Sequence, residues 1–472
     1  MATLTAPLMD NLYLDTFFFF VPTRLVWDNW QKFMGEQENP GDSIDYLIPT
    51  CTSPEGGYQA QSIQDYLGLP INVGGLEHSE LPLRCCYLIY NEWFRDENLQ
   101  DSLVFSKGDN ATPTGFELFK RGKRLDYFTG ALPSPQKFVD GIQIPLSGNA
   151  PVIGNGMSIG IVGSGGATGG FGVAANHVTP YSGLYGTPVG TGNSGSLVNG
   201  SYGLTTDPGK SGLIADMSSV NAATINSLRM AFQIQRLLEK DNRAGTRYTE
   251  ILRSHFSVIS PDARLQRPEY LGGSSTRFMV NTVEQTSATG TGSTPQGNLS
   301  AFAVAGSKIH GFTKSFVEHG YIIGFANVRA DLNYQQGMHR AWSRSTRYDF
   351  YFPVLAHLGE QAILNKEIYA QGTSADNDVF GYQERWAEYR YKPNQITGKF
   401  RSTYAQSLDV WHLAQEFTNL PALNDEFIVD EPPVDRVIAV QDEPQFLLDA
   451  WFKMKDVRPM PTYSVPGLID HF

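Results

Sequence analysis

Residues 13–21, YLDTFFFFV, form a strongly apolar, aromatic stretch that ends at Pro22. Aromatic and β-branched side chains pack well on the pleated surface of a sheet, so this stretch predicts a β-strand. Two further apolar stretches follow at 82–90 and 125–132, separated by clusters of Gly, Pro, Asn and Ser. Short strands between turns, without a regular helix after each strand, are typical of antiparallel β architecture.

Residues 224–256 are the one region with the spacing of an amphipathic helix. The apolar residues that recur at this spacing are Leu228, Ala231, Ile234 and Leu238. Gly245 divides the region into two predicted helices. Further β-type segments are predicted at 308–316, 321–329, 346–352 and 436–440. The predicted fold is therefore mainly β, an antiparallel jelly roll or related sandwich with long loop insertions and a few helices.

The composition changes abruptly in residues 142–213. This segment holds nineteen of the 47 glycines and only two charged residues, Asp207 and Lys210. It still contains Val, Ile, Leu and Tyr, so it can pack on itself or on neighbours. We interpret it as a large loop insertion rather than a disordered linker. Residues 1–141 and 214–472 would then be two parts of one β domain.

The composition also points to self-association. Hydrophobic residues make up 41% of the chain, but charged residues make up only 18%, below the usual share of about a quarter. We therefore expect further copies of the chain to cover part of the surface. With 36 basic and 48 acidic residues the net charge is −12, which suits neutralisation of nucleic acid poorly. If the protein encloses DNA, a locally basic face or a separate basic protein must supply positive charge.

The cysteines and the apolar run near the start bear on the compartment. Cys51, Cys85 and Cys86 are odd in number and two are adjacent, which does not suggest a disulfide framework and favours a reducing cytoplasm. Residues 17–21 are far too few to span a bilayer, and a basic segment and cleavage site are missing. We expect synthesis and assembly in the cytoplasm, without membrane insertion.

Two enzyme-like patterns occur, both within residues 142–213. Ser158 lies in a Gly-x-Ser-x-Gly pattern, which needs a strand-to-helix turn in hydrolases. Residues 190–195, GTGNSG, match the dinucleotide fingerprint, which must open a helix. Helical spacing follows neither pattern, and both arise easily by chance among so many glycines. The dispersed histidines and adjacent cysteines match no metal or redox spacing. We therefore predict no catalytic residue, metal or cofactor.

Two groups of basic residues are candidates for contact with single-stranded DNA. The first comprises Arg329, Arg340, Arg344 and Arg347, interleaved with Tyr334, Trp342, Tyr348 and Phe350. The second comprises Lys120, Arg121, Lys123 and Arg124. Arginine pairs with phosphate and aromatic faces stack on unpaired bases, a combination used in sequence-tolerant binding. Alternatively, the first group forms strands whose arginines pair with carboxylates such as Asp331 and Asp349, and the second is a solvated turn.

Several unusual blocks together resemble the major capsid proteins of gokushoviruses, in the microvirus family of small single-stranded DNA bacteriophages. They are 17–22 with RLVW at 24–27, NEWFRDEN at 91–98, DYFT at 126–129 with ALP at 131–133, RSHF at 253–256, PDARLQRPEYLGG at 261–273, GYQER at 381–385 and PGLIDH at 466–471. The blocks are long and carry tryptophan and proline residues, and the likeness spans the chain except the insertion.

The resemblance implies a structural protein of the virion. Its fold would be a single eight-stranded jelly roll, one copy per asymmetric unit of a T=1 icosahedral shell around a circular single-stranded DNA genome. Residues 142–213 would gather at the three-fold axes into a protrusion that meets a host receptor, with Tyr181, Tyr185 and Tyr202 as candidate contacts. The family's small basic DNA-packaging protein would supply the missing positive charge.

Two other functions stay open on the sequence alone. The first is a monomeric carbohydrate-binding jelly-roll module, which would sediment as a small species. The second is a hydrolase that uses Ser158, which loss of an activity in Ser158→Ala would support. Neither explains the long blocks outside the insertion.

Overall fold

The computed structural model describes residues 1–137, 225–259, 266–286, 296–306, 311–331 and 333–458, together with five short strands between 152 and 215. The chain divides into two compact units, one of Met1–Lys137 with Glu239–Phe472 and the other of Phe138–Leu238. The predicted insertion, 142–213, falls in the second unit. Nearly all described side chains belong to the first.

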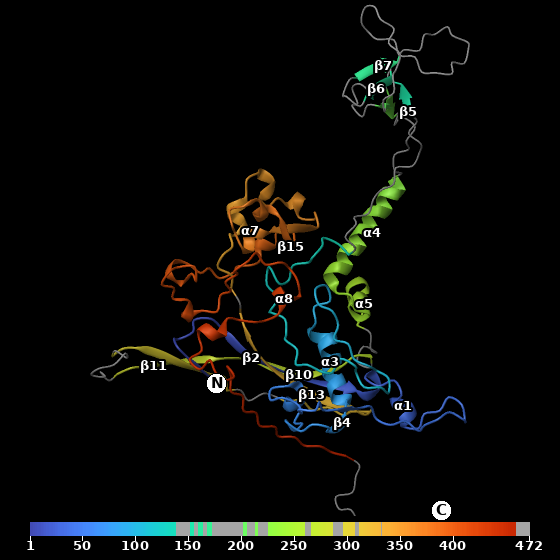
Figure 1. The fold of residues 1–472 in the computed structure, drawn as a ribbon, viewed down its shortest axis with the longest axis vertical. Helices are drawn as coiled ribbons and strands as arrows, with labels where there is room; N and C mark the ends of the chain where they lie inside the picture. The colour runs from blue at the N-terminus through green and yellow to red at the C-terminus, as the bar shows by residue number, and fades with distance from the viewer. Residues whose placement is uncertain are drawn as a thin grey trace, which may run out of the picture. The chain divides into compact units, whose positions relative to one another are not determined.

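A three-stranded antiparallel sheet is central to the first unit (Figure 1). Its strands, in order, are β10 (Glu269–Arg277), β2 (Leu12–Pro22) and β13 (Gly320–Ala330). Phe17 of β2 pairs with Gly273 on one side and Phe325 on the other. Glycine is needed at 273 because a β-carbon there would collide with the backbone carbonyl of Thr16. The strands predicted at 13–21 and 321–329 are both confirmed.

Helix α3 (Leu81–Ile89) packs against β2 and β13 and continues into a π-helical turn, Tyr90–Phe94. The side chains between helix and sheet, such as Phe19 and Val21, are buried. The Phe19 ring centroid lies 5.5 Å from that of Trp93 and 5.8 Å from that of Phe94. Burial of each such side chain stabilises the fold by about 1.5–3 kcal/mol.

A second antiparallel sheet contains β1 (Ala2–Leu4), β12 (Leu299–Val304) and β11 (Met279–Glu284) in that order. Leu4, Ala301, Ala303, Leu413 and Val437 form its core. The shorter elements are the pair β3 (Thr50–Thr52) and β4 (Glu77–Ser79), the pair β14 (Glu360–Leu364) and β15 (Val379–Glu384), and helices α1 (Trp30–Phe33), α2 (Ile63–Tyr66), α7 (Asn365–Ile368) and α8 (Asp425–Ile428).

In the second unit, β5 (Val152–Gly154) pairs with β9 (Leu213–Ala215). There β6 (Ile159–Gly163) lies between β7 (Thr168–Phe171) and β8 (Tyr202–Leu204). Every pair of strands in the described sheets runs antiparallel. The prediction of a mainly β, antiparallel protein with a few helices is confirmed.

The helices predicted within 224–256 are α4 (Ile225–Ala244) and α5 (Tyr248–Phe256). Gly245 separates them with a φ of 95°, a left-handed conformation that glycine adopts without strain. None of the described helices is both long and apolar enough to cross a membrane.

The strand predicted at 82–90 is wrong, because residues 82–89 belong to α3 and Tyr90 begins the π-helical turn. The segment is buried almost all round, and an apolar run of this length does not distinguish a strand from a buried helix. Pro82, in the first turn of α3, was the available signal, since proline is favoured at the start of a helix.

The strands predicted at 125–132, 346–352 and 436–440 are also wrong. In the segment 308–316, the described residues do not form a strand. Residues 125–132 form turns with one isolated bridge, from Leu132 to Tyr382. Residues 346–352 contain the 3-10 turn Arg347–Asp349, and 436–440 contribute only the bridge from Ile438 to Leu4. In 308–316 the described residues, 311–316, are not in a strand. Apolar residues of irregular chain, whether buried like Phe128 or exposed like Tyr348, do not differ in local pattern from those of strands.

A fully buried ion pair fixes the start of α3. Glu80 and Arg84 are both 0% exposed, and their side chains are 3.0 Å apart. Arg84 also donates to the carbonyls of Val26, Gly108 and Asn110, and Glu80 accepts from the backbone N–H of Thr112. The pair therefore joins α3 to two loops. Burying such charges is tolerable only when both are paired and hydrogen-bonded.

We expect Arg84→Met to lower the free energy of unfolding by about 3–5 kcal/mol, because it leaves the Glu80 carboxylate buried without a cation. Urea unfolding of the unassembled subunit, followed by tryptophan fluorescence, measures the change. The matched control is Lys120→Met, which removes an exposed ion pair with Glu431 and should change the free energy by less than about 1 kcal/mol. Equal effects of the two substitutions would contradict the structural role of the pair.

Candidate nucleic-acid interface

The basic residues of 120–124 do not share one surface. Lys120 is exposed and pairs with Glu431. Arg121 is half-buried, 3.2 Å from Asp15, with its guanidinium 4.6 Å from the centre of the Phe17 ring. Burial, with the nearby Arg329, lowers the pKa of Arg121 to about 10 although Asp15 opposes the shift. Arg121 therefore makes its contacts within the subunit.

Lys123 is buried as well. Its ammonium group donates to the side chain of Gln415 and the carbonyl of Phe427, and lies 4.3 Å from the centre of the Phe427 ring. Burial lowers its pKa to about 8, against the nearby carboxylates. Arg124 pairs with Asp331 at 3.1 Å and stacks on Tyr13. Of this group, Lys120 alone has an exposed charged group in the single subunit, and that group is paired with Glu431.

Arg329, from the other predicted group, joins these residues around one carboxylate. Asp15, on β2, lies 3.2 Å from Arg121, 3.9 Å from Arg124 and 3.3 Å from Arg329. Close by, burial raises the pKa of Asp430 to about 6, although Arg329 and Lys123 oppose the shift. The cluster is a packed charge network that ties β2 and β13 to residues 121–124.

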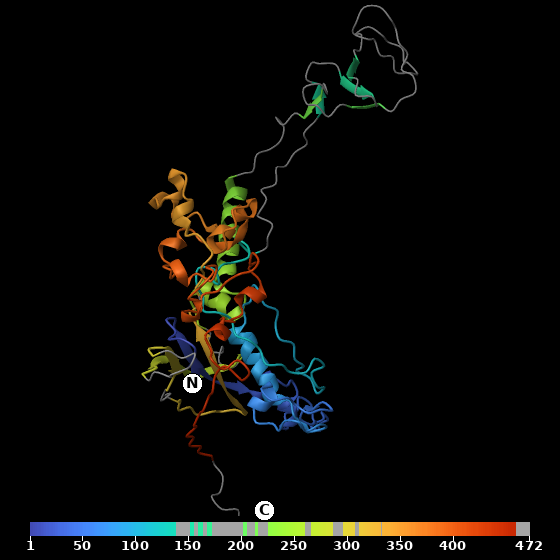
Figure 2. The same cartoon turned by 60° about the vertical axis from the view of Figure 1, so that its left-hand side comes forward.

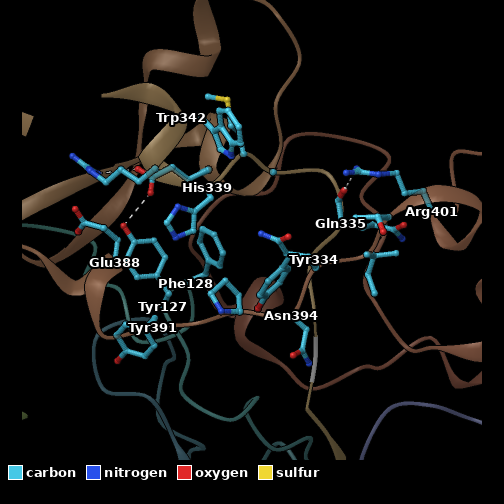
Figure 3. Close-up of a pocket in the computed structure, with 18 residues that line it drawn as sticks. Tyr127, Phe128, Tyr334, Gln335, His339, Trp342, Glu388, Tyr391, Asn394 and Arg401 are labelled. Carbon is cyan, nitrogen blue, oxygen red and sulfur yellow. Dashed lines mark hydrogen bonds and ion pairs between the residues drawn. The ribbon is translucent and has the colours of Figure 1, made fainter. Parts of the chain in front are cut away.

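A pocket of about 520 Å³ collects other predicted residues (Figure 3). Its lining is Tyr127, Phe128, Tyr334, Gln335, Gly337, Met338, His339, Arg340, Trp342, Glu367, Glu388, Tyr391, Pro393, Asn394, Gln395, Ile396, Thr397 and Arg401. Aromatic faces and amide groups therefore meet in one cavity of the first unit. Sequence reasoning identified Tyr334, Arg340 and Trp342 but missed 391–401, because no local pattern in that segment indicates proximity to the others.

Two predicted arginines at or beside this pocket are paired with carboxylates. Arg340 lies 2.9 Å from Glu367, which also accepts from the hydroxyl of Tyr127 at 3.0 Å. Arg344 lies 3.4 Å from Glu388 and stacks on Tyr389. The carboxylate partners Glu367 and Glu388 were not foreseen. Because Arg340 is paired with a carboxylate and Arg401 donates to the carbonyl of Gln335, the pocket offers stacking and hydrogen bonds more than net positive charge.

The aromatic residues beside the pocket are largely exposed. Trp342 is 81% exposed, and Tyr348, Phe350, Tyr351 and Phe352 are also exposed. Arg347 lies over the rings of Tyr348 and Phe352. We call Trp342 and residues 347–352 the aromatic belt. Its chain is held by Asp349, whose carboxylate accepts hydrogen bonds from Thr346 that lower its pKa.

The other predicted sites fall on the second unit. Tyr181 and Tyr185, Ser158 and the GTGNSG segment at 190–195 lie outside the described residues. Tyr202 begins β8, where its backbone pairs with Gly163. Within the described part of the chain, no group of three or more His, Cys, Asp or Glu side chains could hold a metal ion.

Known proteins similar to the chain are capsid proteins. The sequence model of a family described as "Capsid protein (F protein)" matches residues 1–468. Capsid protein VP1 of Bdellovibrio phage phiMH2K is 49% identical, over 100% of this chain and 88% of the relative. Capsid protein VP1 of Chlamydia phage 1 is 45% identical, over 99% of this chain and 88% of the relative. Capsid protein VP1 of Spiroplasma virus 4 is 36% identical, over 99% of this chain and 87% of the relative.

These matches run through both units and leave only the last few residues outside the family model. They agree with the resemblance to gokushovirus capsid proteins that the long blocks of unusual sequence, such as 91–98 and 261–273, indicated. The chain belongs to the capsid (F) protein family of gokushovirus-type microviruses, and it is a major capsid protein of the virion.

Proposed function

We propose that identical copies of this chain close into a T=1 icosahedral shell around a circular single-stranded DNA genome, with an eight-stranded jelly roll as the wall. The full-length match to microvirus capsid proteins carries this proposal. The antiparallel sheets of the first unit suit such a wall. The single subunit also exposes large apolar side chains, among them Leu47, Leu125 and Val354, that further copies would cover.

The purified chain, expressed with its genome-encoded partners, should form closed particles of uniform size, because its exposed apolar surface favours association over a soluble monomer. Electron microscopy and velocity sedimentation measure this outcome. A small, tightly folded species under the same conditions would instead support a monomeric module such as a carbohydrate-binding protein. Ser158→Ala should leave assembly unchanged, since a structural protein needs no nucleophile there.

The charge of the chain limits how it holds DNA. The net charge is −12, and most of the predicted basic residues are paired with carboxylates of the same subunit. A small basic DNA-packaging protein would therefore supply most of the neutralisation. The aromatic belt would supply stacking, which depends little on base sequence. Assembly in the reducing host cytoplasm suits the three free cysteines.

For DNA contact we expect the double change Trp342→Ala with Arg347→Ala to weaken binding of a fluorescent oligothymidylate about tenfold or more, since base–aromatic stacking contributes about 1–3 kcal/mol per base. Fluorescence anisotropy of the unassembled subunit measures it. The matched control is Tyr66→Ala, another exposed aromatic residue on a different segment. Equal binding by the double variant and the control would remove the belt as a DNA contact.

The glycine-rich insertion, 142–213, is proposed to form the protrusion at the three-fold axes and to contribute to host attachment. Its support is compositional: few charges, many glycines, and tyrosines at 181, 185 and 202 that suit contact with a receptor surface. It also belongs to a unit separate from the sheets of the wall.

Replacement of 142–213 by a short Gly-Ser linker should leave particle assembly largely intact and reduce adsorption to host cells to background, because the wall lies outside the deleted segment. Particle yield by sedimentation and adsorption by plaque depletion give the two readouts. The triple change Tyr181→Ala, Tyr185→Ala and Tyr202→Ala should lower adsorption with unchanged particle yield. Particles without the insertion that adsorb normally would disprove the attachment role.

A further inference from the structure

The last described segment of the chain has almost no partner among the described residues of its own subunit. Phe446 is its last anchored side chain, with a ring centroid 5.8 Å from that of Phe278. At Leu447 the backbone exchanges two hydrogen bonds with Met1, of 2.9 Å and 3.0 Å. Residues 448–458, which we call the C-terminal arm, then continue without helix, turn or bend. Both views show this end of the chain leaving the strands of the first unit (Figures 1 and 2).

The arm is unpaired as well as extended. Among the described residues, none of 448–458 makes a backbone hydrogen bond, a side-chain hydrogen bond or an ion pair. All eleven are exposed. Backbone N–H and C=O groups in an extended chain are ready to pair with a sheet edge.

The side chains of the arm are those of a strand that packs on something. In an extended chain alternate residues point to the same side. Within 448–455, Leu448, Ala450, Phe452 and Met454 then form an apolar face, whereas Asp449, Lys453 and Lys455 lie on the other face with Trp451. This alternation is typical of a half-buried strand. Trp451 is 89% exposed in the single subunit, so the segment is apolar without being buried.

The amount of apolar surface is large enough for a subunit contact. The large apolar side chains exposed between 447 and 457 are Leu447, Leu448, Trp451, Phe452, Met454 and Val457. Those on the apolar face, Leu448, Phe452 and Met454, present roughly 400 Å², about half of what each partner contributes to a standard protein–protein interface. The backbone hydrogen bonds of an added strand would contribute further contact. A fully extended arm of this length reaches about 35 Å beyond Leu447, which is far enough to cross onto an adjacent subunit.

Sheet edges that could receive the arm are present on every copy. Within the described residues, β10 and β11 each lie at the end of a three-stranded sheet and have one edge without a partner strand. On β11 the apolar side chains of Met279 and Val283 are exposed. Such an edge pairs readily with a further extended segment, and addition of a strand is a common mode of recognition between chains.

From these observations we infer that the C-terminal arm docks as an added strand on a neighbouring copy of the same chain and so ties adjacent subunits of the shell together. The inference rests on the proposed shell. The arm is anchored to its own subunit through Phe446 and Leu447, and its apolar face is buried only on the neighbour. In a closed shell each subunit both donates one arm and receives one.

The test compares three forms of the full-length chain. Variant A carries Leu448→Ser, Phe452→Ser and Met454→Ser, which remove the apolar face. Variant B carries Lys453→Ser and Lys455→Ser on the opposite face and is the matched control. Particle yield is measured by sedimentation, and the urea midpoint of each unassembled form is measured in parallel.

We expect variant A to lose about tenfold or more in particle yield at an unchanged urea midpoint, because truncation of central interface residues costs at least about 1.4 kcal/mol. Variant B should assemble within about twofold of the unmodified chain.

Each other outcome overturns the inference in a distinguishable way. If variant A assembles as well as the unmodified chain, the arm does not hold the shell, although the proposed shell stands. A lower urea midpoint of unassembled variant A would mean that the arm packs on its own subunit. An equal loss in variants A and B would mean that the apolar face is not what the neighbour recognises. Failure of the unmodified chain to assemble would instead contradict the proposed function itself.

Discussion

The first unit depends on β2 having a partner strand on both sides. The eleven residues of Leu12–Pro22 pair with β10 and β13, two segments that occur far later in the chain. A run of four consecutive phenylalanines suits this position because both faces of the strand are covered. Phe17 and Phe19 face the α3 side, whereas Phe18 and Phe20 pack on Phe312 and Phe316. Without this strand the β10 and β13 segments would share no sheet.

The same strand also organises the charges. Asp15 sits on β2 among Arg121, Arg124 and Arg329, so one buried carboxylate holds three guanidinium groups that come from two distant parts of the sequence. At the pocket, Glu367 and Glu388 likewise pair with Arg340 and Arg344. Many arginines of this acidic capsid protein therefore pair with carboxylates of their own subunit.

The subunit is incomplete as a soluble body, which is expected of a shell component. Its exposed apolar side chains lie in irregular segments, in the aromatic belt and in the C-terminal arm, more than on the sheets. Sheets provide a rigid wall because their strands are tied by regular hydrogen bonds. Loops and arms have unpaired backbone and adaptable geometry, so they can form different contacts with different neighbouring copies.

The sequence by itself determined the β class, the strands at 13–21 and 321–329, the helix pair around Gly245 and the capsid family. These features have strong local signals: an aromatic run, helical spacing and long blocks of unusual residues. Only the tertiary structure decided that 82–90 is a helix, because an apolar run buried on all sides has no period to read. The tertiary structure also decided which basic side chains are exposed and which are buried or paired with carboxylates. Arg121, Arg124 and Arg329 meet at Asp15 through strand pairing across the whole chain, and no local pattern encodes such a distant contact.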